Sequence, residues 1–266
     1  MPPTRTVLAL HGYCQSGAIF SKRIGALRKQ CKDVEFVFVD APLILEPVDI
    51  AGSFPQNTAT KVDGSEAALA SVGAAEVATD ASMIPRGWWK KDPTSDRAVG
   101  IEDSIAVIKE VLRGRRFDSS FLILASSQGA AFASLISAHR IRPCDYFLFC
   151  RATFLTDVRS EFCINVAGFK VRDPLFAQTY GAGYSTPTLH VIGRNDVVVI
   201  PERSQTLVDV SLNGRLELHD GGHFVPSKGP WRKFLESYMR LGPSAEVPSP
   251  SGNADSAPGS GTATPA

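Results

Sequence analysis

The sequence predicts an α/β protein whose mostly parallel central sheet carries helices on both faces. Short apolar runs rich in β-forming residues recur along the chain, and helical patterns separate them. The chain has 266 residues, of which 44% are hydrophobic and 21% are charged, so one large domain can bury a substantial core. We expect that domain to span residues 1–241.

Four continuous apolar runs are the predicted strands. They span residues 7–10, 34–39, 121–124 and 188–193, and several end at Gly, Asp or Ser, which favour turns. Runs without polar alternation are typical of strands buried on both faces of a parallel sheet. The predicted helices lie between the strands, over residues 20–30, 101–112, 129–139 and 201–211, with Lys or Arg near several carboxyl ends.

Two segments depart from this alternation. Residues 46–85 are rich in Gly, Ser, Thr, Ala and Pro, and together with the stretch that follows they form a lid-like or inserted segment over 46–100. Long irregular segments inside a compact domain are usually functional or disordered. Residues 242–266 consist mainly of Pro, Ser, Gly, Ala and Thr without periodicity, which predicts a disordered tail.

The composition excludes several classes of function. Lys and Arg number 28 against 27 Asp and Glu, so nothing indicates a nucleic-acid partner. No stretch reaches the roughly 20 apolar residues that a membrane span needs, and the first apolar run is too short for a signal peptide, so we expect a cytoplasmic protein without a membrane partner. The five cysteines lack C-x-x-C spacing, which argues against a disulfide framework and a zinc site.

The turn between a predicted strand and helix reads A-x-S-x-G around Ser127. In a nucleophile elbow the serine needs small residues two positions before and after it, because strand and helix approach closely there. Ala125 and Gly129 meet that need, whereas centring the motif on Ser126 places Gln128 where a small residue belongs. The pattern alone also fits a tight turn with a helix-capping serine, so its context decides.

Two further motifs supply that context. Asp196 follows the strand at 188–193, at the end where α/β sheets build their sites, although an Asx turn or a helix cap would also place an Asp there. His223 follows two glycines that suit a loop reaching over the sheet, whereas His219 lies in the preceding strand and is more typical of a packed histidine. The order Ser127, Asp196, His223 is that of α/β-hydrolases.

This order predicts a serine hydrolase that cleaves an acyl ester or thioester through an acyl-enzyme. Ser127 would be the nucleophile, His223 the general base, and Asp196 the residue that orients the base. Water would then release the acyl group. The chemistry needs no metal and no organic cofactor.

The strand at 7–10 opens into a glycine-containing loop that can aim a backbone N–H group at a developing oxyanion. We assign the oxyanion hole to the backbone amides of Tyr13 and Gln128, each typically worth about 3 kcal/mol to the transition state. Gly12 is expected to lie against the substrate. His11 is interpreted as a structural histidine that holds this loop.

Trp88 and Trp89 follow the Gly- and Ala-rich stretch and are candidate substrate-binding residues. A lid over a sheet edge commonly shapes specificity. Packing of the two rings onto the core explains them equally well.

A set of motifs runs through residues 5–240: L-x-L-H-G-Y-x-Q-S-G at 8–17, F-V-D-A-P at 38–42, R-G-W-W at 86–89, S-Q-G-A-A at 127–131, A-G-F-K-V-R-D-P at 167–174, T-P-T-L-H-V-I-G-R-N-D at 186–196 and G-G-H-F-V-P at 221–226. In these motifs the chain resembles the eukaryotic family of serine hydrolases with the α/β-hydrolase fold. Within that family it is similar to the discrete thioesterases and esterases that accompany fungal polyketide synthases. The resemblance implies the same triad, and it implies release of a polyketide or related acyl chain from an acyl carrier protein in secondary metabolism.

The chain departs from the family pattern in two places. Ala125-Ser126 stands where the family usually has Gly and an aromatic residue, and an Ala methyl is the smallest possible intrusion at that position. Residues 151–163 interrupt what the pattern would make one strand, 147–150 continuing at 164–167, which suggests an insertion or a gene-model error.

Two rival functions remain open. The first is a general carboxylesterase that acts on small or lipid-like esters. Comparing rates on thioesters and oxygen esters would distinguish it from a thioesterase. A non-catalytic pseudo-hydrolase would bind acyl groups or a synthase partner and would not react with a fluorophosphonate.

Overall fold

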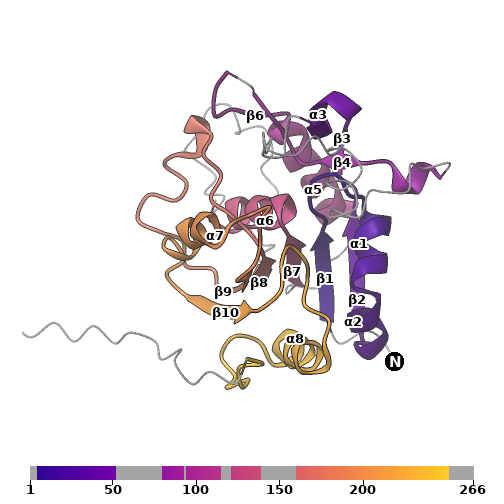
Figure 1. Cartoon of the computed structure of the whole chain (residues 1–266), viewed down its shortest axis with the longest axis vertical. Coiled ribbons are helices and arrows are strands. Elements are labelled where there is room, and N and C mark those ends of the chain that lie inside the picture. Colours follow the sequence, from indigo (N-terminus) through magenta and orange to yellow (C-terminus); the bar gives the residue numbers. More distant parts are fainter. Residues whose placement is uncertain (1–4, 52–79, 93, 115–120, 139–159, 252–266) are drawn as a thin grey trace, which may run out of the picture.

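The computed structural model describes residues 5–51, 80–92, 94–114, 121–138 and 160–251. A six-stranded sheet in the order β10-β9-β8-β7-β1-β2 forms its centre, and neighbouring strands pair in parallel (Figure 1). The strands are β1 (Arg5–Leu10), β2 (Val34–Val39), β7 (Phe121–Ser126), β8 (Ser160–Val166), β9 (Thr188–Gly193) and β10 (Gly214–His219). The predicted α/β fold class is confirmed.

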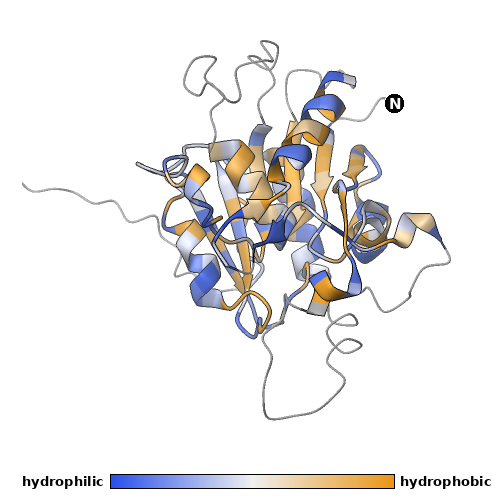
Figure 2. Ribbon diagram, turned by 90° about the horizontal axis from the view of Figure 1, so that it is seen from above, coloured by the Kyte–Doolittle hydropathy of each residue, from blue (hydrophilic) through white to orange (hydrophobic). Residues whose placement is uncertain are grey.

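Helices cover both faces of the sheet. On one face lie α1 (Gly17–Arg23), α2 (Gly25–Gln30) and α8 (Gly229–Leu241), and on the other α5 (Ile101–Gly114), α6 (Gln128–Ala138) and α7 (Pro201–Val208). Each face of the sheet has its own hydrophobic core, and alternate side chains of β1 belong to one or the other. Val7 and Ala9 pack with the first set of helices, and Leu8 and Leu10 pack with the second. Figure 2 accordingly shows hydrophobic strands at the centre. Burial on both faces explains why the strands read as continuous apolar runs.

The strand order places one end of the sheet in a position to carry a site. β1 continues to β2 on one side, whereas β7 lies on its other side and leads on to β8, β9 and β10. Connections that leave in opposite directions open a crevice at the carboxyl ends of the two central strands. Leu10 is in register with Ala125, so the loop after β1 and the turn after β7 meet there.

The predicted elements agree closely with the observed ones. The strands at 34–39 and 188–193 have the predicted bounds, and β1 and β7 are each two residues longer than predicted. The helix predicted over 20–30 is instead two helices, because Ile24 between them leaves the helical region with φ −94° and ψ 17°.

The lid-like segment is described only in part, since residues 52–79 and 93 lie outside the described ranges. Its described parts are α3 (Pro47–Ala51), the 3₁₀ turn η1 (Ala81–Met83) and the short strands β4 (Arg86–Gly87), β5 (Lys90–Lys91) and β6 (Ala98–Val99). β4 pairs with β3 (Leu43–Ile44) and β5 with β6. Arg86 also exchanges backbone hydrogen bonds with Cys14 and Gln15, which ties the segment to the loop after β1.

Two of the predicted segments reach into described parts of the chain. Ser160–Cys163, predicted as the end of an insertion, form the first part of β8, where Phe162 and Cys163 are fully buried; residues 147–150 and 151–159 lie outside the described residues. The tail predicted to be disordered from Gly242 is packed as far as residue 251: Val247 is buried and its carbonyl accepts a hydrogen bond from Arg215. A sequence rich in Pro and Ser can dock in this way when a few side chains find partners, which composition does not reveal. No helix in the described ranges is both long and apolar enough to span a bilayer.

Candidate active site

Ser127 occupies a strained turn between β7 and α6. Its φ is 54°, a left-handed value that is uncommon for a residue other than glycine. The Ser127 N–H donates to the Val166 carbonyl at 2.8 Å, and the Ser127 carbonyl accepts from the Ala131 N–H at 3.0 Å. Strand and helix therefore hold the serine in a conformation of the kind that concentrates at functional sites.

The small residues around Ser127 are required by close packing. A Cβ atom added to Gly129 would overlap the His11 carbonyl oxygen and lie 2.6 Å from the Leu10 carbonyl oxygen, and neither backbone atom can move easily. Ala125 is fully buried on β7. The predicted need for a small side chain two positions after Ser127 thus has a direct structural reason.

Asp196 and His223 form a hydrogen-bonded pair. Asp196 Oδ2 lies 2.8 Å from His223 Nδ1, and the two side chains are 0% and 8% exposed. Asp196 Oδ1 accepts hydrogen bonds from the N–H groups of Val198 and Val199, each at 2.9 Å. The carboxylate is therefore fixed, and a proton on Nδ1 leaves Nε2 as the acceptor nitrogen of His223.

The loops that carry these two side chains are joined along their backbones. The Asn195 N–H donates to the Gly221 carbonyl at 3.1 Å. A Cβ atom on Gly193 would lie 2.5 Å from the Gly222 carbonyl oxygen, so the approach is possible only because residue 193 is glycine. The two residues before His223 contribute backbone carbonyl groups to this approach.

His219 supports the His223 loop, a role that the sequence argument did not assign. Its Nδ1 accepts a hydrogen bond from the Gly221 N–H at 3.1 Å, and its ring packs against Phe224 and Trp231. In the described part of the chain its Nε2 is buried without a partner, and burial lowers the pKa of His219. The spacing H-x-G-G-H was the available signal for this support.

We expect His219→Leu to lower kcat/KM about tenfold, because the Gly221 N–H then loses its acceptor and His223 is held less firmly. His219→Asn should restore part of the loss, since its side-chain oxygen can accept the same hydrogen bond. Steady-state kinetics on one neutral ester, with thermal unfolding as the check on stability, measures both variants. Equal losses of kcat/KM in the two variants would show that the hydrogen bond to Gly221 does not account for the effect of His219 on activity.

The loop after β1 lies directly against the nucleophile. A Cβ atom on Gly12 would come within 3.2 Å of the Ser127 Cβ atom. His11 Nε2 accepts from the Ala41 N–H at 3.0 Å, so its Nδ1 donates to the Gly12 carbonyl at 2.8 Å. Burial lowers the pKa of His11 to about 4, so the ring is neutral and its role is to hold the loop. Use of the Tyr13 and Gln128 backbone amides as the oxyanion hole stays a prediction.

Gln128 joins the lid-like segment to the elbow through its side chain. Its Oε1 accepts from the Trp88 N–H and its Nε2 donates to the Trp89 carbonyl, both at 2.8 Å. Trp88 is fully buried, stacks on Phe132 and donates from its indole nitrogen to the His11 carbonyl. This geometry favours the packing interpretation for Trp88; contact of Trp88 or Trp89 with substrate stays a prediction.

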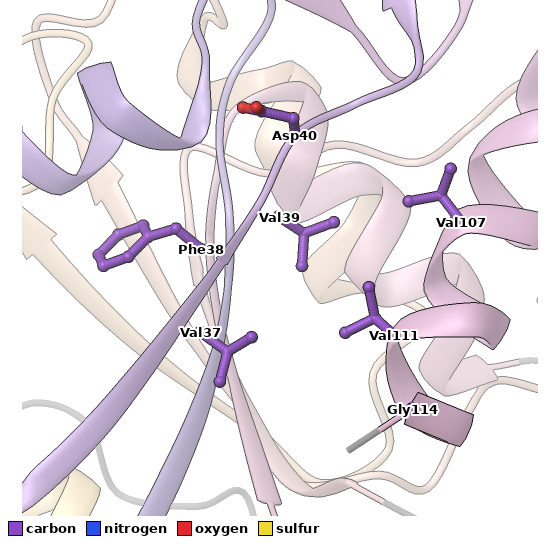
Figure 3. Close-up of a pocket in the computed structure, with 7 residues that line it drawn as sticks. All are labelled: Val37, Phe38, Val39, Asp40, Val107, Val111 and Gly114. Atoms are coloured by element: carbon purple, nitrogen blue, oxygen red, sulfur yellow. The ribbon is translucent and has the colours of Figure 1, made fainter. Parts of the chain in front are cut away.

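Two hollows in the described residues bear on the position of the site. A cavity of about 290 Å³ adjoins the site and is lined by Gln15, Phe20, Arg23, Ser126, His223, Phe224, Val225 and Ser227. A hollow of about 390 Å³ lies between β2 and α5 (Figure 3), lined by Val37, Phe38, Val39, Asp40, Val107, Val111 and Gly114. The second hollow contains none of the predicted catalytic residues. The described residues include no group of three or more His, Cys, Asp or Glu side chains that could hold a metal ion.

Comparison with known proteins gives one family. A family model described as "Serine hydrolase (FSH1)" matches residues 1–235. Esterase OVCA2 of Xenopus tropicalis is 31% identical over 248 residues, which cover 88% of this chain and 93% of the relative. Family of serine hydrolases 3 of Saccharomyces cerevisiae is 28% identical over 238 residues, covering 87% of this chain and 82% of the relative.

Solved structures share the fold at lower identity. Zea mays acyl-protein thioesterase 2 is 16% identical with a TM-score of 0.56, covering 91% of this chain and 94% of that one. Esterase PE8 is 18% identical with a TM-score of 0.55, covering 90% and 93% of the two chains. These likenesses show an α/β-hydrolase fold.

Proposed function

Because the chain belongs to the FSH1 serine hydrolase family and is an esterase of that family, we propose that Ser127, His223 and Asp196 are its catalytic triad. The observation that carries this proposal is the 2.8 Å contact between Asp196 and His223. It occurs at the same end of the sheet as a serine in a left-handed turn. A buried carboxylate that holds Nδ1 of a histidine in this way supports a role for His223 as the general base.

In the proposed reaction His223 Nε2 takes the proton of the Ser127 hydroxyl as the oxygen attacks the carbonyl carbon of the substrate. The backbone N–H groups of Tyr13 and Gln128 stabilise the oxyanion that forms. His223 then returns the proton to the leaving alcohol or thiol, and water releases the acyl group from Ser127 by the same steps. Asp196 keeps His223 in the tautomer that the first step needs.

We propose that the substrate is an acyl thioester, and that the protein releases a polyketide or related acyl chain from an acyl carrier protein in the cytoplasm. The motifs that resemble fungal polyketide-associated thioesterases support this choice. The fold neighbour named acyl-protein thioesterase 2 is consistent with it. A general carboxylesterase is the second candidate, because the curated relatives are named esterases.

A matched pair of substrates separates the two candidates. The hexanoyl thioester of N-acetylcysteamine and the hexanoyl ester of N-acetylethanolamine differ only in sulfur against oxygen. A thioesterase should show the higher kcat/KM on the thioester, and a higher value still when the same acyl chain is carried by an acyl carrier protein. Equal or faster cleavage of the oxygen ester would instead establish the carboxylesterase.

A further inference from the structure

The cavity beside His223 has an unusual combination of walls. Phe20, Phe224 and Val225 form an apolar part, whereas Gln15, Ser126 and Ser227 are polar and Arg23 carries a charge. Ser126 precedes Ser127 directly, so the cavity reaches the nucleophile elbow. At about 290 Å³ it can hold a small group of a substrate rather than a whole one.

Arg23 is the feature of this cavity that most needs a partner. It is the last residue of α1, it is half-buried, and in the described ranges it forms no ion pair. Burial lowers its pKa, and no neighbouring charge opposes that effect. A guanidinium withdrawn from water is normally paired with an anion, since desolvation without a partner is costly.

Ser126 explains why the cavity is open. It is 7% exposed, and its side chain, which lines the cavity, is far smaller than that of a leucine or an aromatic residue. An aromatic residue at this position would reduce the cavity that Phe20 and His223 also line. The serine thus leaves room for a substrate group to reach toward Arg23.

We propose that this cavity binds an anionic group, a carboxylate or a phosphate, that is carried by the ester or thioester substrate, with Arg23 as its counter-charge. Guanidinium groups bind both anions through paired hydrogen bonds. The apolar walls would cover the methylenes between the anion and the scissile bond. The inference rests on the proposed function, because the anion must belong to a molecule that Ser127 attacks.

Two pairs of substrates test this proposal and locate the anion. The 4-nitrophenyl monoester of glutarate against 4-nitrophenyl pentanoate tests a carboxylate on the acyl side. S-butyryl-4′-phosphopantetheine against S-butyrylpantetheine tests a phosphate on the leaving side. We expect kcat/KM to be about tenfold or more higher for the charged member of one pair, the size of a charge-assisted hydrogen bond.

Two variants should abolish that preference. Arg23→Gln removes the charge, and Ser126→Phe fills the cavity; in Arg23→Gln, turnover of the neutral substrates should remain within about twofold. Arg28→Gln is the matched control, because Arg28 is an exposed arginine on α2 that bonds to Ser21 and does not line the cavity. It should keep the full preference.

The failure of this inference and that of the proposed function are distinguishable. Efficient cleavage of the neutral substrates with no preference for either anion would overturn the anion site and leave the triad in place. Calorimetric binding of the glutarate monoester and of S-butyryl-4′-phosphopantetheine to Ser127→Ala protein requires no turnover. If neither molecule binds more weakly when Arg23→Gln is added, the proposal is overturned. Loss of binding of either one with Arg23→Gln would support it even in an inactive protein.

Discussion

Asp196→Asn is expected to lower kcat/KM about 10⁴-fold without unfolding the protein. Asp196 Oδ1 accepts from two backbone N–H groups, so an asparagine must keep its oxygen at that position. Its NH₂ group would then face His223 Nδ1 and donate to it. The proton of the imidazole would move to Nε2, where it prevents His223 from accepting the proton of Ser127.

Kinetics on an activated ester measures this loss, and circular dichroism with thermal unfolding shows that the variant is folded. Asp220→Asn is the matched control: Asp220 lies three residues before His223, its side chain is 94% exposed, and it forms a surface ion pair with Arg194. That variant should retain activity within about twofold. Similar activity in Asp196→Asn and wild type would mean that Asp196 does not orient the base.

Gly129→Ala is expected to lower the free energy of unfolding by about 3 kcal/mol. The added methyl group would overlap two backbone carbonyl oxygens, that of Leu10, the last residue of β1, and that of His11, which follows it. Relief requires α6 to move away from β1, which would also displace the elbow that holds Ser127. Activity should therefore fall together with stability.

Denaturant unfolding tests this expectation, with Gly25→Ala as the matched control. Gly25 begins α2, and an added Cβ atom would meet nothing within 4 Å, so alanine there should be neutral or slightly stabilising. A Gly129→Ala protein as stable as wild type would show that the contact between α6 and β1 relaxes easily.

Four of the six strands, β1, β2, β7 and β9, were predictable because they are continuous apolar runs, which are typical of a parallel sheet. β2 and β9 are bounded by turn residues and contain few polar groups, so their limits could be read directly. The site followed from chain order, since Ser127, Asp196 and His223 each stand after a strand, and parallel strands end at the same edge.

The missed features depend on contacts between distant parts of the chain. Gln128 holds a segment 39 and 40 residues away, and Trp88 donates to a carbonyl 77 residues away. Val247 is buried although its surroundings are rich in Pro and Ser. No local pattern encodes such pairings, because they arise only once the sheet and its helices are assembled.

The most direct test of Ser127 as the nucleophile is fluorophosphonate labelling of the purified protein, followed by peptide mapping. We expect one labelled serine, Ser127, and no labelling of a folded Ser127→Ala variant. Labelling of Ser126 instead, or no labelling of well-folded wild-type protein, would contradict the proposed triad, and the second result would favour a binding role for the fold.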